Sequence, residues 1–175
     1  GKYPRILEDE IVGEAARSLF ADARKMLDDV IAGNRLTAHG VVGFWPANAV
    51  GDDVELYADE TRDKAIARLH GLRQQIAKRD NAAPNYCIAD FIAPKETGKR
   101  DYVGAFAVTA GVGEEALAAS YDDKHDNYSS IMAKAIADRL AEAFAEHLHA
   151  RVRRELWGYA KGETISVEEM IGEKY

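Results

Sequence analysis

Three acidic residues spaced four positions apart are the feature of this sequence that points most directly to chemistry. Asp138, Glu142 and Glu146 lie in a segment with helical periodicity, so their side chains stack on one face. Since two residues turn a helix by about 200°, this face lies roughly 160° from the apolar face of the same helix. Like charges at this spacing repel by about 0.2–0.5 kcal/mol unless cations such as Lys134 and Arg139 answer them. The pattern indicates either a solvated polar face or an acidic ridge that meets a cationic or hydrogen-bond-donating partner.

A second acidic pair precedes that helix. Glu114 and Glu115 open a shorter helical segment, directly after the sequence Gly-Val-Gly at positions 111–113. Carboxylates in a first helical turn complement the helix dipole, which is the plain structural explanation for this pair. The Gly-Val-Gly sequence lacks the third glycine of a dinucleotide-binding fingerprint, so it predicts a turn from a strand into a helix.

The remaining reactive side chains follow no pattern of known chemistry. The five histidines match no metal-binding motif, and His147 and His149 lie two apart on a helix, so they point about 200° apart. We interpret the histidines as surface or capping residues. Cys87 is the single cysteine, which excludes an internal disulfide and a thiolate metal cluster, and its apolar neighbours favour a buried, inert thiol. The sequence therefore predicts neither a metal site nor a catalytic nucleophile.

Charge and composition exclude other classes of function. The chain has 175 residues, with 30 acidic against 23 basic ones and 47% hydrophobic residues, an ordinary globular balance. The net charge of −7 argues against nucleic acid as a partner, because phosphate binding requires a positive field. No run approaches the ~20 apolar residues of a membrane span, and the start GKYPRILEDE lacks the apolar core of a secretory signal. These features predict a soluble, cytoplasmic protein without a membrane partner.

Periodicity and turn signals divide the chain into helical and extended segments. The expected helices span residues 8–32, 61–77, 114–121 and 127–156, and the expected strands span 41–45, 54–57, 86–92 and 102–108. Pro46 is expected to end the first strand. The last two strands are mostly apolar, which predicts central strands covered on both faces. Their connections are too short for helical crossovers, so the pairs are expected to be antiparallel.

This order of elements predicts an α+β fold, with a mainly antiparallel sheet covered by helices and one long helix in the C-terminal half. At ~1.5 Å per residue the long helix would extend about 45 Å and span the domain. Residues 1–175 are interpreted as a single domain. Ser166 and Glu169 form a capping box that opens a last helix, and the sequence stops close to that helix, which indicates a piece of a longer protein.

Several long stretches make the sequence similar to a known family. They are GKYPRIL at the start, GVVGFWPANAVGDDVELY at 40–57, LRQQ at 72–75, NYCIADFIAPKETGKRDYVGAFAVTAG at 85–111, KAIADRLAEAFAEHLHARVRRELWGYA at 134–160, and EKY at the end. Together they resemble the activation domain of cobalamin-dependent methionine synthase, truncated at both ends. The similarity runs along the whole chain, so it is far more specific than any single motif.

The resemblance implies a function in the repair of a methyltransferase of methionine biosynthesis. The full enzyme moves a methyl group from methyltetrahydrofolate to homocysteine through cobalamin, and its cob(I)alamin form is occasionally oxidised to inactive cob(II)alamin. Activation domains of this family bind S-adenosylmethionine over the cobalamin. One electron from a flavodoxin-like or other flavoprotein donor, together with that methyl group, restores methylcobalamin. The implied partners are this electron donor and the cobalamin-binding module of the same enzyme, while cobalamin and zinc belong to other modules.

The resemblance also implies roles for four carboxylates, none of them catalytic. Glu142 and Glu173 match acidic residues near the S-adenosylmethionine cleft, where a carboxylate can balance the sulfonium charge. Asp138 and Glu114 match residues that meet the displaced cobalt-ligating histidine of the cobalamin module, where a carboxylate would stabilise the imidazolium. The main ligand-holding residues of the family are an aspartate upstream of GKYP and an arginine after EKY, and both lie outside this sequence.

Two functional hypotheses of different classes follow. The first is a reactivation module of a methyltransferase, which supports reductive methylation of cob(II)alamin by S-adenosylmethionine without being catalytic in isolation. The second is a non-catalytic docking scaffold that recognises the cobalamin-binding module or the electron donor and binds no ligand of its own. An independent hydrolase or metalloenzyme has no sequence feature in its favour.

Overall fold

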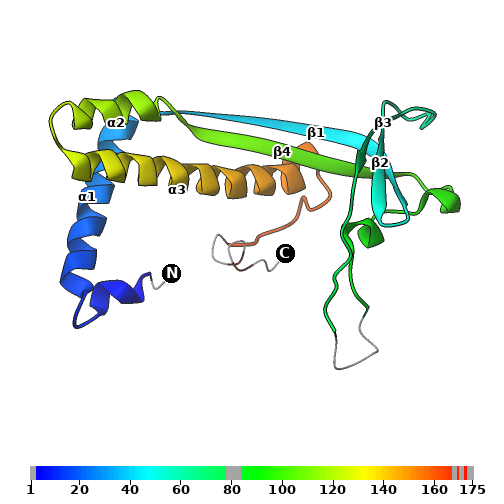
Figure 1. The fold of residues 1–175 in the computed structure, drawn as a ribbon, viewed down its shortest axis with the longest axis horizontal. Coiled ribbons are helices and arrows are strands. Elements are labelled where there is room, and N and C mark those ends of the chain that lie inside the picture. The colour runs from blue at the N-terminus through cyan, green and yellow to red at the C-terminus, as the bar shows by residue number, and fades with distance from the viewer. Residues whose placement is uncertain (1–2, 78–83, 167–168, 170–171, 173–175) are drawn as a thin grey trace. The chain divides into compact units, whose positions relative to one another are not determined.

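The α+β class expected from the sequence is confirmed. The structure is a computed structural model that describes residues 3–77, 84–166, 169 and 172. Its strands form one four-stranded sheet in the order β3-β2-β1-β4, in which β2 pairs antiparallel with both β1 and β3 (Figure 1). The chain divides into two compact units, which we call unit 1 (Gly1–Val41 with Ala107–Tyr175) and unit 2 (Val42–Phe106).

Unit 1 carries the helices. They are η1 (Arg5–Glu8), α1 (Gly13–Ala32), α2 (Glu114–Asp122), α3 (Asn127–Arg151) and the π-helical turn η4 (Val152–Leu156) that continues α3. Asp126 caps α3, because its carboxylate accepts a hydrogen bond from the Ser129 amide at 3.0 Å. The core of unit 1 lies where α1, α2 and α3 meet and consists of Met26, Val30, Leu117, Met132 and Ala133.

The long helix expected over 127–156 is confirmed, as α3 with η4. The first helix begins later than expected, at Gly13 instead of residue 8. The reason is the Asp9 carboxylate, which accepts hydrogen bonds from the amides of Ile11 and Val12 at 2.9 and 3.0 Å. Such local side-chain bonds favour a turn over a continuous helix.

Unit 2 contains most of the sheet. Its strands are β2 (Asp53–Tyr57), β3 (Ala65–Leu69) and parts of β1 (Thr37–Val50) and β4 (Asp101–Val112). The expected antiparallel pair of the first two strands is confirmed, with Val50 opposite Asp53 across a two-residue turn. Pro46 does not end β1. The pairing with β2 begins one residue later, at Ala47, so the missing N–H of the proline breaks no bond in that pairing.

The prediction of a helix over 61–77 is wrong. Residues 65–69 form β3, which pairs with β2 so that Leu69 lies opposite Val54, and residues 70–77 contain no helix. Before β3, the Asp59 carboxylate accepts bonds from the Thr61 amide and hydroxyl, and Arg62 has a positive φ of 60°. The apolar residues of 61–77 are spaced as in a helix, but the turn and the pairing with β2 favour a strand. The pairing forms hydrogen bonds with the backbone groups of both segments.

The strand expected over 86–92 is also wrong. This segment contains the 3-10 helix η2 (Ile88–Phe91), and a second one, η3 (Lys95–Thr97), follows. Asp90 explains the 3-10 helix η2. Its carboxylate accepts a hydrogen bond from the Cys87 amide at 2.9 Å and one from each of Arg73 Nη1 and Nη2 at 2.7 Å. The partner strand expected over 102–108 is present as β4, but it lies at an edge of the sheet and is not the covered central strand we expected.

The capping box at Ser166 is confirmed in its hydrogen bonds. The Ser166 amide donates to the Glu169 carboxylate at 3.0 Å, and the Glu169 amide donates to the Ser166 hydroxyl at 3.2 Å. The rest of the helix expected there falls largely outside the described residues.

A charged network anchors the core of unit 2. The Glu55 carboxylate, on β2, accepts a hydrogen bond from Lys95 Nζ at 2.8 Å, from Arg68 Nη2 at 2.6 Å and from the Tyr57 hydroxyl at 3.1 Å. The Glu55 side chain is only 10% exposed. These donors, Lys95 first, lower the pKa of Glu55 to about 2.

We therefore expect Glu55→Gln to change how stability depends on pH. The pKa of Glu55 is lowered by folding, so its ion pairs stabilise the fold above about pH 4.5 and are lost as the pH falls toward 2. The difference in unfolding free energy between the wild type and Glu55→Gln should be largest near pH 5–7 and should shrink toward pH 2. Urea titrations at several pH values measure it, with the exposed Glu96→Gln as the control. A difference that is constant over this pH range would contradict the assignment.

Candidate functional site

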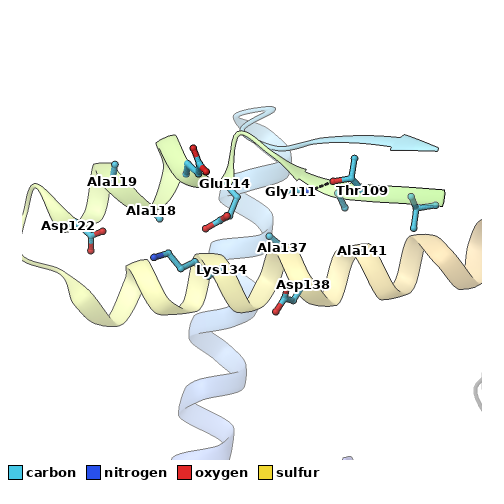
Figure 2. Close-up of a pocket in the computed structure, with 13 residues that line it drawn as sticks. Thr109, Gly111, Glu114, Ala118, Ala119, Asp122, Lys134, Ala137, Asp138 and Ala141 are labelled. Atoms are coloured by element: carbon cyan, nitrogen blue, oxygen red, sulfur yellow. Dashed lines mark hydrogen bonds between the residues drawn. The ribbon is translucent and has the colours of Figure 1, made fainter. Parts of the chain in front are cut away.

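A groove in unit 1 gathers acidic side chains from two helices (Figure 2). It lies among α2, α3 and the end of β4, and its volume is about 600 Å³. Its charged lining residues are Glu114, Glu115, Asp122, Lys134 and Asp138, and small residues such as Gly111, Ala118 and Ala137 make up most of the rest. We call it the acidic groove. Four carboxylates face one ammonium group there, so it carries a formal excess of three negative charges.

The turn before α2 fixes the position of Glu114. Gly113 precedes the helix with a φ of 103°, in the left-handed region that glycine adopts without strain. A Cβ atom on this residue would lie 2.6 Å from the carbonyl oxygen of Arg35, so a side chain has no room. The expected strand-to-helix turn is confirmed. Glu114 is the first residue of α2, directly after this turn, and lines the groove.

Asp138 and Glu114 both line this groove. Asp138 is exposed and Glu114 is half-buried. Throughout residues 3–77 and 84–166, neither carboxylate forms a hydrogen bond or an ion pair within the protein. Both are therefore available to a donor from outside, and Asp138 is not locked in an internal ion pair.

The excess of negative charge in the groove attracts cations and hydrogen-bond donors. Within the part of the chain that the structure describes, no group of three or more His, Cys, Asp or Glu residues is placed to hold a metal. Its small lining residues offer no aromatic ring on which a purine could stack.

None of the helices in the described residues combines the length and apolarity needed to cross a membrane.

Comparison with known proteins identifies the family. The sequence model of the vitamin B12 dependent methionine synthase activation domain matches residues 1–175. The chain belongs to this family. A crystal structure of the MetH reactivation domain bound to AdoHcy is 59% identical in sequence and superposes with a TM-score of 0.93. The match covers 100% of the present chain and 53% of that chain, so the present chain spans about half the length of this relative. The resemblance inferred from the sequence is confirmed.

Of the other expected site residues of this activation domain, the structure describes Glu142, which does not line the acidic groove. Glu142, one turn beyond Asp138 on α3, forms an exposed ion pair with Arg139 at 2.7 Å and does not line the groove. Such a pair contributes little to stability. Glu146, the third member of the acidic series, is half-buried and also lies outside the groove. Glu173 lies outside the described residues.

Sequence reasoning missed Asp122, and it named Lys134 only as a counter-charge to the acidic series, without placing it in the groove. Asp122 ends α2 eight residues after Glu114, a spacing of just over two turns that places both on one side of the helix. Lys134 precedes Asp138 by four residues and therefore shares its face of α3. Both spacings are visible in the sequence, but the pairing of the α2 and α3 faces comes only from the packing of the two helices (Figure 2).

The end of α3 is held by a further ion pair of this activation domain. The Arg153 guanidinium binds the Glu163 carboxylate through Nε and Nη2, and its carbon lies 5.7 Å from the centre of the Tyr159 ring. Both charged side chains are nearly buried, at 11% and 14% exposure, and the pairing lowers the pKa of Glu163. The pair ties the segment after η4 back onto the helix.

Proposed function

We propose that the chain is the reactivation module of a cobalamin-dependent methionine synthase, the methyltransferase that transfers a methyl group from methyltetrahydrofolate to homocysteine. The observation that carries this proposal is the match of the activation-domain family over residues 1–175, with 59% identity to a reactivation domain. In the reaction that the module supports, bound cobalamin would accept one electron from an external donor and the methyl group of S-adenosylmethionine, and S-adenosylhomocysteine would leave. The chain acts as a single domain of the parent enzyme and is not catalytic in isolation.

The acidic groove is the docking site for the displaced histidine of the cobalamin-binding module. Asp138 and Glu114 lie in one groove and have no partner of their own among residues 3–77 and 84–166. A carboxylate beside an imidazole stabilises the protonated ring, so docking favours the state in which the histidine has left the cobalt. The groove therefore acts by binding one of two states of the enzyme more tightly, which shifts their populations.

S-adenosylmethionine is held mainly by parts of the parent protein that flank residues 1–175. The relative that binds AdoHcy has about twice the length of this chain. The acidic groove has no aromatic ring for the adenine, so it fits an imidazolium better than a nucleoside. Glu142 and Glu173 supply carboxylates near the sulfonium. The electron comes from a flavodoxin-like or other flavoprotein donor, and cobalamin and zinc are bound by other modules.

A docking scaffold without ligand binding of its own is the second candidate function. One observation favours it for these 175 residues taken alone: the charged groove is present, whereas this chain covers only 53% of the relative that binds AdoHcy. The two functions differ in whether the module contributes to holding the methyl donor.

Calorimetric titration with S-adenosylmethionine tests the proposal. The parent methionine synthase should bind it stoichiometrically, and the 175-residue chain should bind it at least tenfold more weakly, because the flanking segments are missing. Heat of binding from the parent but none from the chain alone would assign these residues the scaffold role within a reactivating domain. A parent protein that does not bind S-adenosylmethionine would contradict the proposed function. Tryptophan-monitored unfolding of the chain checks that it is folded during the titration.

A further inference from the structure

Lys134 is the one cation that lines the acidic groove, and it has no anionic partner within the described residues. It projects from α3, one turn before Asp138, and Figure 2 shows its side chain reaching from α3 toward Asp122 at the end of α2. No ion pair forms between Lys134 and a carboxylate of residues 3–77 or 84–166, since none lies within 4.0 Å of its nitrogen. Its positive charge therefore acts on the whole groove and is not neutralised by an ion pair with one carboxylate.

We propose that Lys134 is a positioning residue that weakens docking of the incoming histidine at the acidic groove. This inference rests on the proposed function of the groove, and it adds a regulator to the pair formed by Asp138 and Glu114. A lysine beside four carboxylates lowers the negative potential that an arriving imidazolium meets. It also repels the imidazolium directly, because the two cations share one open groove.

Weaker binding of the histidine is useful because the histidine must later dissociate from the groove. Reactivation is followed by a return to primary turnover, which requires the histidine to leave the groove and the docked state to be minor. A groove with all four carboxylates unopposed would bind a protonated ring more tightly and would retain the docked state. Lys134 sets this balance, while Asp138 and Glu114 supply the attraction.

The experiment replaces Lys134 by methionine in the parent methionine synthase carrying cob(II)alamin. The absorption spectrum of cob(II)alamin changes when the axial histidine leaves the cobalt, so it reports the ratio of the docked to the undocked state. Removal of a partly screened charge should raise this ratio about two- to fivefold, as expected for exposed charge pairs. The charge reversal K134E should raise it further. The control is Lys25→Met, which removes the same charge from α1, outside the groove.

The outcomes separate this inference from the proposed function. A higher docked fraction in K134M than in K25M supports it. An equal rise in both variants would overturn it, since the effect would then come from net charge. An unchanged or lower fraction in K134M, together with a clear loss in Asp138→Asn, would overturn the role of Lys134 and leave the function of the groove standing. If neither K134M nor Asp138→Asn changes the spectrum, the groove does not receive the histidine at all. Circular dichroism checks that each variant is folded.

Discussion

Reactivation of the parent methionine synthase should slow by about ten- to a hundredfold when Asp138 is replaced by asparagine. The estimate follows from the loss of one hydrogen bond to a charged group, about 1.5–3 kcal/mol, with about 1.4 kcal/mol for each factor of ten. The carboxylate is exposed in the acidic groove and has no partner among the described residues, so the substitution leaves no buried charge behind. The amide keeps the shape of the side chain but no longer stabilises an imidazolium.

Two rates measured on the same protein distinguish this role from a general defect. The first is the return of active enzyme from the cob(II)alamin form with S-adenosylmethionine and a reductant. The second is steady-state turnover with methyltetrahydrofolate and homocysteine, which should change by less than a factor of two. Glu146→Gln is the matched control, because it removes the same charge from the same helix outside the groove. Equal slowing in both variants, or an unchanged reactivation rate in Asp138→Asn, would contradict the docking role.

The sequence predicts the helices of unit 1 well because local signals determine them. The four-residue apolar series in 127–156 and the glycine before Glu114 define α3 and the start of α2 without help from distant residues. The same signals place Asp138 and Glu114 correctly on their helices. That the two side chains share a groove depends on the packing of α2 against α3, which no local pattern encodes.

The secondary structure predicted for two segments of unit 2, 61–77 and 86–92, is wrong because long-range contacts determine their structure. The segment 61–77 has an apolar spacing that suits a helix, but its structure is decided by partners far along the chain. Residues 65–69 pair with β2, and Arg73 binds the carboxylates of Asp52 and Asp90. Asp90 in turn holds the 86–92 segment in a 3-10 turn through the Cys87 amide. Such long-range contacts override local propensity.

Gly71 is a position in unit 2 where a single added methyl group should have a large effect. A Cβ atom there would lie 2.1 Å from the carbonyl oxygen of Asp52 and 2.7 Å from Cys87 Sγ. The same carbonyl accepts a hydrogen bond from the Cys87 thiol at 3.3 Å, and the Gly71 amide donates to the Asp53 carboxylate at 3.3 Å. The nearer obstacle is backbone, so it cannot rotate away as a side chain would.

Gly71→Ala should therefore destabilise unit 2 by about 3 kcal/mol, within the range for overpacked positions that force the backbone to move. This corresponds to a fall in melting temperature of about 6–12 °C for a chain of this size. Trp45 packs against the core of unit 2, so its fluorescence, in a Trp157→Phe background, follows the unfolding of this unit. Cys87→Ala should not rescue the variant, because the clash with the Asp52 carbonyl remains.

The matched control for this prediction is Gly162→Ala, where an added Cβ meets no heavy atom within 4 Å. It should change the melting temperature by no more than about 2 °C, as surface substitutions within ±0.5 kcal/mol do. A Gly71→Ala protein as stable as this control would mean that the 70–77 segment does not pass against the β1–β2 turn and Cys87 as described. The turn, the thiol and the Arg73 ion pairs would then have to be reassigned together, since each of them fixes the path of that segment.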